Sequence, residues 1–374
     1  MQGQIMLKKI FFFLKLSLFP VLGWPQSKDA TRLKMICVKL YQCFCIILAI
    51  GLLLTLIYAI TIHFNNFLIL VELILGVSAL THSIGNFISH IIFDHRIQYV
   101  TFEMIHFSEL IKPHEDIIIQ RYIDKRIIFY GLSIITFYLA TVIVVILPFM
   151  MNQPFPLLTE YPFDTYRQPL RTILYIHQAI VGVHVSAQLC SNVYMAALLW
   201  FASARFEILT EELRKATDIY YLAKCIKKHQ DLLKYANEAV LAARPFALTT
   251  VCCSTVCMVI LCLIILTDQS LLLLIKCTGL VLSALSEVFM YTWPAEHLIY
   301  TTQDVGQAAF DMPWYDQSIE IRNCIQIIMQ RSQKPVTVAI ACVMPTLSLS
   351  YFASYCSTIV SFFTTFRAFL NDEE

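Results

Sequence analysis

The sequence predicts an all-α membrane protein, a seven-transmembrane helical bundle with a cytoplasmic N-terminus. Three observations lead to this fold class. Of the 374 residues, 58% are hydrophobic and only 14% are charged, whereas soluble domains usually carry about 25% charged residues. The apolar residues gather into seven long runs that hold almost no charge. Lys and Arg concentrate in alternate connections between these runs.

Each apolar run is long enough for one membrane span, since a helix needs about 20 apolar residues to cross a hydrocarbon core of about 30 Å. Helix is favoured over strand because a single span must satisfy its backbone polar groups internally. The alternation typical of a membrane barrel is absent. Five runs contain no Asp, Glu, Lys or Arg, and the second and sixth contain one and two. The runs are 40–62, 67–93, 127–151, 172–204, 245–267, 269–295 and 336–366.

The distribution of positive charge orients the bundle. Four segments, which precede the first, third, fifth and seventh runs, hold 23 of the 27 Lys and Arg residues, and the opposite side holds only three. Because cytoplasmic loops carry the excess of Lys and Arg, the N-terminus is predicted to be cytoplasmic and the C-terminus external. The expected organisation is a cytoplasmic amphipathic segment (1–36), spans one to four (37–204), a cytoplasmic helical extension (205–244), spans five and six (245–300), a second cytoplasmic segment (301–334), span seven (335–370) and an extracellular tail (371–374).

Enzyme chemistry is not visible in the chain. It has no G-x-x-x-x-G-K phosphate loop, no G-x-G-x-x-G and no G-x-S-x-G, and its net charge of +1 gives no pull toward nucleic acid. His114, Glu115 and Asp116 lack a second histidine at metal-ligand spacing, so we expect a solvated loop there. His177 and His184 share a helix face, where interhelical hydrogen bonding is favoured over metal or ligand binding. We therefore expect no catalytic residue, no cofactor, no metal site and no nucleic-acid partner.

The last apolar run carries a stripe of hydroxyl groups. Its Ser and Thr side chains recur at steps of three and four, so at 100° per residue they would share one narrow face of a helix. A lipid-facing helix gains nothing from such a face. Two interpretations remain open from the residues alone: the hydroxyls bond to neighbouring helices, or they line a water-filled path. The stripe comprises Thr346, Ser350, Ser354, Ser357, Thr358, Ser361 and Thr365.

Three charges lie within the apolar runs: Glu72, Lys276 and Glu287. Such residues usually face the bundle interior and mark functional positions, although a lysine near a helix end also reaches the interface by snorkelling. Glu72 and Lys276 lie at similar depths and are candidates for an ion pair. The outer connection 152–170 holds four prolines and is predicted to cover the bundle as a stiff lid.

Four short motifs occur in order along the chain. They are Leu22-Gly23-Trp24-Pro25; Ala308-Ala309-Phe310-Asp311-Met312-Pro313-Trp314-Tyr315-Asp316; Arg331-Ser332-Gln333-Lys334-Pro335; and Ser361-Phe362-Phe363-Thr364-Thr365-Phe366-Arg367. Together with the seven expected spans and a cytoplasmic N-terminus, they resemble the insect odorant receptors over the whole chain. Phe310 stands where that family usually has Tyr.

This resemblance implies a function. Members of the family form tetrameric ligand-gated cation channels, in which a variable odorant-binding subunit joins a shared co-receptor in the plasma membrane of the olfactory neuron dendrite. We therefore expect a multi-pass chain in the lipid bilayer that binds small volatile odorants and opens a non-selective cation pore in a hetero-tetramer with the insect odorant co-receptor. The family's last helix lines the pore, which favours the water-filled path for the hydroxyl stripe.

The resemblance also assigns residues by position. The pore and gate are expected at Ser350, Ser354, Ser357, Thr358, Ser361, Thr365 and Phe369, where Thr365 departs from the usual aliphatic gate residue. An odorant pocket in the outer half of the bundle is expected at Leu75, Ala79, Tyr138, Thr141, His184, Gln188, Ser283, Glu287 and Tyr291. Subunits are expected to meet at the cytoplasmic segments, with Phe310, Trp314 and Tyr315 in the assembly motif.

Two other receptor classes fit the sequence less well. A gustatory receptor, which forms a homomeric ligand-gated channel, tends to end its last helix on a Gln-Phe pair, and this chain has Phe366-Arg367 instead. A G-protein-coupled receptor has an external N-terminus and usually an Asn-Pro-x-x-Tyr ending, and the chain shows neither feature. The co-receptor itself is disfavoured because the segment 205–244 lacks its long insertion.

Overall fold

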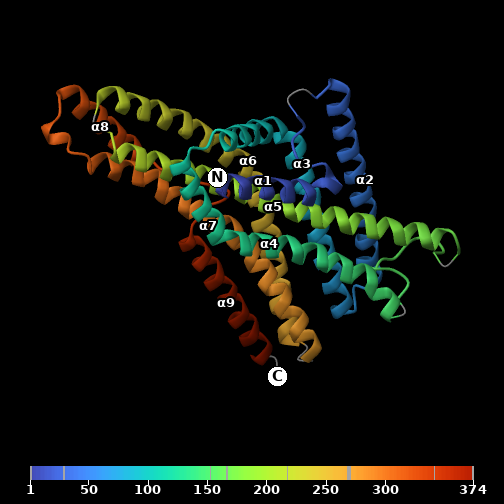
Figure 1. The fold of residues 1–374 in the computed structure, drawn as a ribbon. Helices are drawn as coiled ribbons and strands as arrows, with labels where there is room; N and C mark the ends of the chain where they lie inside the picture. The colour runs from blue at the N-terminus through green and yellow to red at the C-terminus, as the bar shows by residue number, and fades with distance from the viewer. Residues whose placement is uncertain are drawn as a thin grey trace.

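The computed structural model describes residues 2–27, 30–151, 153–165, 167–216, 218–267, 271–340 and 342–372, and no side chains at 151, 267, 271–276, 316 and 369–372. Long helices build almost the whole described chain (Figure 1). They are α1 (Gln2–Ser17), α2 (Arg32–Ile62), α3 (Phe67–Glu109), α4 (Pro113–Met151), α5 (Leu170–Arg214), α6 (Ile219–Thr267), α7 (Leu271–Phe310), α8 (Ile319–Ser332) and α9 (Leu349–Asp372), with short 3-10 helices η1 (Phe19–Val21) and η2 (Trp314–Asp316).

Five of the described helices, α2 to α6, are long and apolar enough to cross a membrane. The sixth and seventh expected spans correspond to α7 and α9. With 45 and 49 residues, α5 and α6 are each roughly 70 Å long at 1.5 Å per residue, about twice the hydrocarbon thickness. Residues 205–214 and 219–244 therefore continue α5 and α6 as helix beyond the apolar runs, and their cytoplasmic position stays a prediction.

The helix starts follow from local sequence signals. Thr31 caps α2, where its hydroxyl accepts from the Lys34 amide, and Asn66 caps α3, where its side chain accepts from the Ile69 amide at 3.4 Å. Pro113 begins α4, a position where the missing N–H costs nothing. The start of α2 at Arg32 precedes the expected first span, because its first two turns extend beyond the apolar run.

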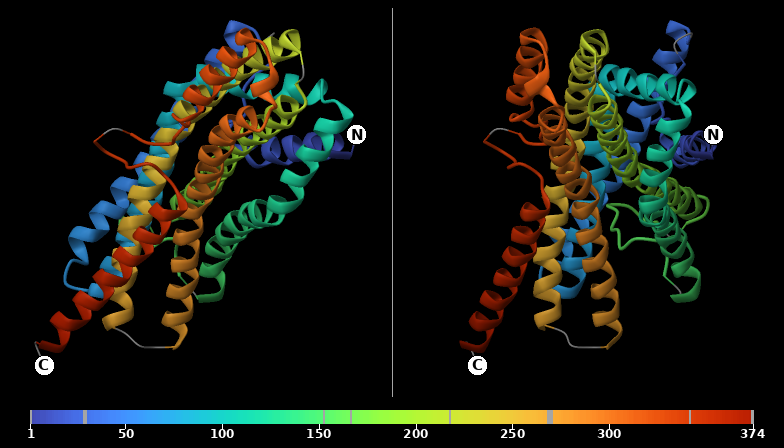
Figure 2. Two further views of the ribbon diagram at one scale, coloured as in Figure 1. Left: turned by 90° about the vertical axis from the view of Figure 1, so that its left-hand side faces the viewer. Right: turned by 60° about the vertical axis from the view of Figure 1, so that its left-hand side comes forward.

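The bundle is built around α5, which contacts α3, α4, α6 and α7. From Cys190 to Leu213 nearly every α5 side chain is buried. Many are small, such as Ala196, Ala202 and Ala204, which lets neighbouring helices approach closely. The C-terminal half of α5, the first half of α6, the end of α7 and α8 gather at one end of the molecule, and α9 descends toward the opposite end (Figures 1 and 2).

The outer connection folds over α5, as expected for a lid. The Gln178 side chain accepts a hydrogen bond from the Leu157 amide at 3.0 Å and donates to the Thr159 hydroxyl at 2.8 Å. Phe155 is buried beside these groups. The amide of one α5 side chain thus ties the described part of this connection to the bundle.

The start of the last helix differs from the prediction. The uncharged run begins at residue 336, but the helix begins at Leu349, and Ile340 pairs with Met344 in a short antiparallel bridge. Pro345 provides the reason, since it lacks an amide donor and disfavours helical geometry in the residue before it. Val338 and Leu347 in this segment are fully buried. The apolar residues of this segment therefore pack into the core and do not extend the helix. Thr346 precedes Leu349, so it is not part of the helical stripe.

The solvated loop predicted at residues 114–116 is also wrong, because all three residues lie in the first turn of α4 and only His114 is exposed. Glu115 and Asp116 are buried. The Asp116 carboxylate accepts from the Gln4 amide at 2.7 Å and from the Gly3 amide at 3.2 Å. It therefore caps α1, which crosses the long helices and packs on α4 (Figure 2). A side chain at Gly3 would meet the Asp116 backbone oxygen at 2.7 Å, so this close approach requires glycine.

Replacing Asp116 with Ala is expected to loosen α1 from α4. Loss of a helix cap costs about 0.5–2 kcal/mol, so the purified variant should melt at a lower temperature and be cleaved faster by protease within its first 20 residues. Asp124→Ala is the matched control, because Asp124 lies on the exposed face of the same helix and bonds only to the Gln120 side chain, at 2.7 Å. Equal cleavage rates in the two variants would show that Asp116 does not hold α1 in place.

Candidate functional site

The hydroxyl stripe of α9 faces away from its own subunit. Tyr355 and Ile359 are buried against α6 and α7. All six helical stripe residues are exposed: Ser350, Ser354, Ser357, Thr358, Ser361 and Thr365.

In the described structure, three hydroxyl groups of the stripe form hydrogen bonds within α9. The hydroxyls of Thr358, Ser361 and Thr365 donate to the carbonyl oxygens of Ser354, Ser357 and Ser361, at 2.8, 3.0 and 2.8 Å. The structure therefore gives no support to bonding between helices of one subunit. The side chain of Phe369, the other expected gate residue, lies outside the described residues.

A second feature is a buried cluster, the polar core, that joins α3, α5 and α7. It consists of His82, Asn86, Asn192, Glu287 and Tyr291. The Tyr291 hydroxyl donates to Asn192 Oδ1 at 3.0 Å, and Asn86 Nδ2 lies 3.4 Å from the same oxygen. His82 Nδ1 and Glu287 Oε2 are 3.8 Å apart. Asn86, Asn192 and Tyr291 are completely buried, so these bonds replace water contacts that the bundle excludes.

Further groups extend the polar core to α6 and along α5. His82 Nε2 lies 3.1 Å from the Thr250 hydroxyl, and the Thr249 hydroxyl donates to Asn86 Oδ1 at 2.9 Å. Asn86 Nδ2 also donates to the Gln188 carbonyl at 3.2 Å. The side-chain nitrogen of Gln188 is buried without a hydrogen-bond partner in the described structure. Four helices, α3, α5, α6 and α7, therefore meet at this buried polar cluster.

Most polar-core residues on α3 and α5 were not among the predicted site residues. A signal for them exists in the sequence, because His82, Asn86 and His90 recur every four residues within the second apolar run. That spacing places all three side chains on one helix face. His90 confirms the pattern, since its Nε2 lies 2.9 Å from the Ser191 hydroxyl on α5.

The nine expected pocket residues do not form one set. Glu287, Tyr291 and Gln188 lie at the polar core. His184 instead faces α2, where its Nε2 lies 3.5 Å from the Tyr41 hydroxyl. The remaining residues are placed elsewhere: Tyr138 and Thr141 on the side of α4 that faces α1 and α5, Leu75 packed between α3 and α6, Ser283 half-buried on α7, and Ala79 exposed on α3.

Tyr138 borders an open apolar groove between α1, α4 and α5, with a volume of about 750 Å³. The Tyr138 hydroxyl donates to the Ser17 carbonyl at 2.6 Å, which fixes the end of α1 against α4. Ile134 and Val193 add to the apolar wall. Of the nine predicted pocket residues, three therefore lie at the polar core, Tyr138 lines this groove, and the others lie elsewhere.

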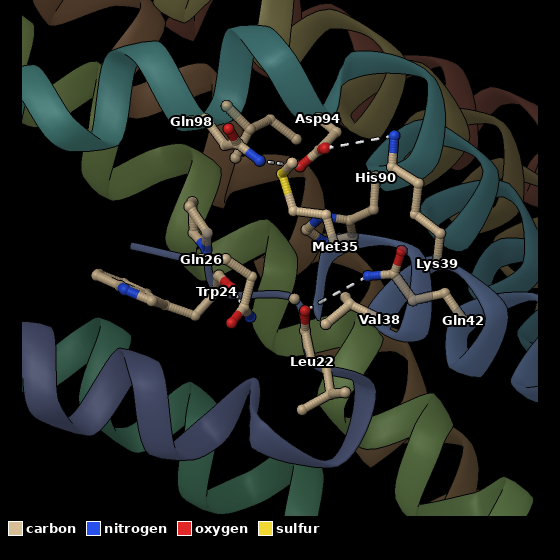
Figure 3. Close-up of a pocket in the computed structure, with 13 residues that line it drawn as sticks. Leu22, Trp24, Gln26, Met35, Val38, Lys39, Gln42, His90, Asp94 and Gln98 are labelled. Carbon is tan, nitrogen blue, oxygen red and sulfur yellow. Dashed lines mark hydrogen bonds and ion pairs between the residues drawn. The ribbon is translucent and has the colours of Figure 1, made fainter. Parts of the chain in front are cut away.

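The Leu22-Gly23-Trp24-Pro25 motif has a structural role (Figure 3). Leu22 adopts a left-handed conformation with φ of 49°, and its carbonyl accepts a hydrogen bond from Gln42 Nε2 at 3.4 Å. Beside this turn, Lys39 pairs with Asp94 at 3.6 Å. The cavity lined by these residues measures about 30 Å³, the volume of a single water molecule. The turn therefore joins the N-terminal segment to α2 and α3 and leaves no room for an odorant.

At the opposite end from the C-terminus, the expected assembly motif presents aromatic surface. Phe310 is 50% exposed and Tyr315 is 62% exposed, while the Trp314 indole donates to the Phe310 carbonyl at 3.2 Å. Such exposed aromatic groups are frequent at interfaces between subunits.

Three acidic or imidazole groups nearby, from His114, Glu115 and Glu212, lie close enough to hold a metal ion. Lys228 contacts both Glu212 carboxylate oxygens at 2.6 and 2.5 Å, so its ammonium already neutralises that carboxylate. The absence of a metal site stays a prediction. The proposed Glu72–Lys276 pair also stays a prediction, because the Lys276 side chain lies outside the described residues.

The architecture defines a multi-pass α-helical membrane protein with a buried polar cluster that joins four helices and a polar face on its last helix. A profile of the 7tm odorant receptor family matches residues 101–360. This match covers more than half of the chain, and the chain belongs to the odorant receptor family.

Curated relatives support this assignment. Odorant receptor 13a of Drosophila melanogaster is 24% identical over 249 residues, which are 60% of this chain and 59% of that protein. Odorant receptor 22c of the same species is 26% identical over 164 residues, 44% of this chain and 40% of that protein. The odorant receptor coreceptor of Aedes aegypti is 35% identical over 85 residues, 23% of this chain and 18% of that protein. The chain thus matches less than two thirds of the length of these relatives.

Solved structures confirm the fold over nearly the full length. The olfactory receptor OR5 of Machilis hrabei superposes with a TM-score of 0.83 and 16% sequence identity, covering 97% of this chain and 98% of OR5. The structure of OR5 in complex with eugenol gives a TM-score of 0.77 and 15% identity over the same fractions.

Proposed function

We propose that this chain is the odorant-binding subunit of an odorant-gated, non-selective cation channel, formed as a hetero-tetramer with the odorant co-receptor. The observation that carries the proposal is the exposed hydroxyl stripe of α9, which is polar, uncharged and unused within its own subunit. Such a face is expected on a helix that lines a water-filled path together with the equivalent helices of the other subunits. In this arrangement the N-terminus and the α5–α6 extensions are cytoplasmic, as the Lys and Arg distribution indicates.

The odorant pocket of the proposed channel lies around the polar core. The family relationship and the eugenol complex of OR5 support a small volatile ligand. Apolar burial at about 25 cal/mol per Å² would supply most of the affinity. The Gln188 amide, which is buried without a partner, would provide a directed hydrogen bond that selects oxygen-bearing volatiles.

Helix α7 connects this site to the proposed pore. Glu287 and Tyr291 belong to the polar core, while Val288 belongs to the apolar cluster that buries Tyr355 of α9. The Phe289 ring contacts the Phe352 ring with centroids 5.3 Å apart. A ligand that binds more tightly when α7 has shifted would stabilise a shifted α9 as well. This is how an odorant would change the population of open channels.

The test is whole-cell current recorded during exposure to a broad panel of volatiles, in cells that express this chain with and without the co-receptor. We expect an inward, non-selective cation current that requires both chains. Surface labelling of the chain controls for expression. Current from this chain alone would instead indicate a homomeric channel of the gustatory type. Silence in both conditions, with both chains at the surface, would contradict the proposal.

A further inference from the structure

The groove between α1, α4 and α5 contains a buried cation at one end. Its walls are formed by apolar side chains, among them Leu14, Ile123, Ile134 and Val193. Arg126 of α4 lines the same groove and is only 7% exposed. Arginine is almost never buried to this degree unless it is paired, so the environment of this guanidinium requires an explanation.

Aromatic rings surround the Arg126 guanidinium without neutralising its charge. Its central carbon lies 3.7 Å from the Trp200 ring centroid and 4.3 Å from that of Tyr122. One terminal nitrogen donates to the Tyr122 carbonyl at 3.0 Å, whereas Nε is buried without a hydrogen-bond partner. Among the described residues no carboxylate lies within 4.0 Å of it. Glu207, an acidic group of the neighbouring α5, is instead engaged by Arg121 at 2.9 Å.

The length of the groove also limits its occupant. Arg126 and Tyr138 both line it and are twelve residues apart on α4, which corresponds to roughly 18 Å along the helix axis. That distance is about half the thickness of a bilayer core of roughly 30 Å, and so matches one leaflet. The volume of about 750 Å³ exceeds what a small volatile molecule fills.

We propose that this groove is a lipid site, which binds an acyl chain of an anionic phospholipid from the surrounding bilayer with its phosphate at Arg126. The phosphate oxygens accept from the guanidinium, whose Nε has no hydrogen-bond partner in the described structure. The acyl chain packs against Ile134 and Tyr138, which line the groove. Lys8 and Lys9 are exposed on α1, the helix that forms one wall, and favour an anionic membrane surface.

Two substitutions test the head and the chain separately. Arg126→Gln removes the charge, and Arg121→Gln, on the same helix but outside the groove, is its control. Gly131→Leu adds a side chain where Gly131 lines the groove and its Cβ would meet nothing within 4 Å. Gly51→Leu is its control, because Gly51 on α2 also faces open space and does not line the groove. Replacing glycine inside a helix does not lower helix propensity, so the second pair of variants keeps the test valid if Arg126→Gln fails to fold.

The experiment uses the full-length chain, purified from vesicles of phosphatidylcholine with or without phosphatidylserine, and measures retained lipid by mass spectrometry. We expect phosphatidylserine to be retained in preference to phosphatidylcholine. Arg126→Gln should lower that retention about tenfold or more, the scale of one charged hydrogen bond. Gly131→Leu should lower retention of both lipids. Equal retention of the two lipids by the unmodified chain, or unchanged retention in Arg126→Gln and Gly131→Leu, would overturn the proposal.

Discussion

Single cysteines introduced at Ser354, Ser357 or Ser361 will make the odorant-evoked current sensitive to a charged thiol reagent, and most of the current will be lost on reaction. The three side chains lie on the exposed stripe of α9. If the last helices of the four subunits surround a water-filled path and this stripe faces it, each introduced thiol meets the permeating ions, and a bulky charged adduct there obstructs them. The measurement is whole-cell current before and after the reagent, with the odorant present throughout.

The controls for this experiment come from the same helix. Ile359 is 7% exposed and packs against α6 and α7, so Ile359→Cys should leave the current unaffected by the reagent. Val360 is 61% exposed and lies about 120° around α9 from Ser354, and Val360→Cys should react weakly because this side of the helix meets lipid or a neighbouring subunit. The unmodified chain measures the contribution of its native cysteines. Equal block at Val360 and Ser354 would mean that the hydroxyl stripe does not define the pore wall.

Replacing Asn192 with Leu will destabilise the protein and greatly reduce its response to odorants. Asn192 is completely buried, and its Oδ1 accepts from Tyr291 at 3.0 Å and lies 3.4 Å from Asn86 Nδ2. Leu has a similar size but accepts no hydrogen bond, so both partners lose a contact in a fully buried site. Each buried group left unsatisfied costs about 1–3 kcal/mol. Thermal melting of the purified chain and odorant-evoked current should both report the loss.

The specificity of this effect can be measured with two further variants. Thr81→Val is the control on α3, since the Thr81 hydroxyl is exposed and bonds only to the Val77 carbonyl of its own helix at 2.8 Å. It should leave melting and current nearly unchanged. Tyr291→Phe should lower stability alone and have a smaller effect in the Asn192→Leu background, because the two substitutions remove the same bond. Fully additive effects would show that Asn192 and Tyr291 are not coupled.

The candidate site was only partly predictable from the sequence. Glu287 stood out because a carboxylate in an apolar run is costly unless it has partners, and the structure places it 3.8 Å from His82. Its neighbours in the polar core, His82, Asn86 and Asn192, are not charged like Asp, Glu, Lys or Arg, so a search for charges in the apolar runs does not find them, and His82 and Asn86 are visible only through their spacing of four residues. His184 was predicted at the pocket only from its expected depth in the membrane. Depth does not determine which neighbouring helix a side chain faces.

The sequence by itself determined the membrane fold class, the approximate position of each long helix and the family motifs. These properties are local, because the length of an apolar run decides whether one helix can cross a bilayer. The tertiary structure alone decided that Asp116 caps α1 and that the α9 hydroxyls face outward. Each of these depends on contacts between segments far apart in the chain, such as Asp116 with Gln4 or Tyr355 with α6 and α7. Helix periodicity gives the angle between two residues on one helix, and only packing decides which neighbour each face meets.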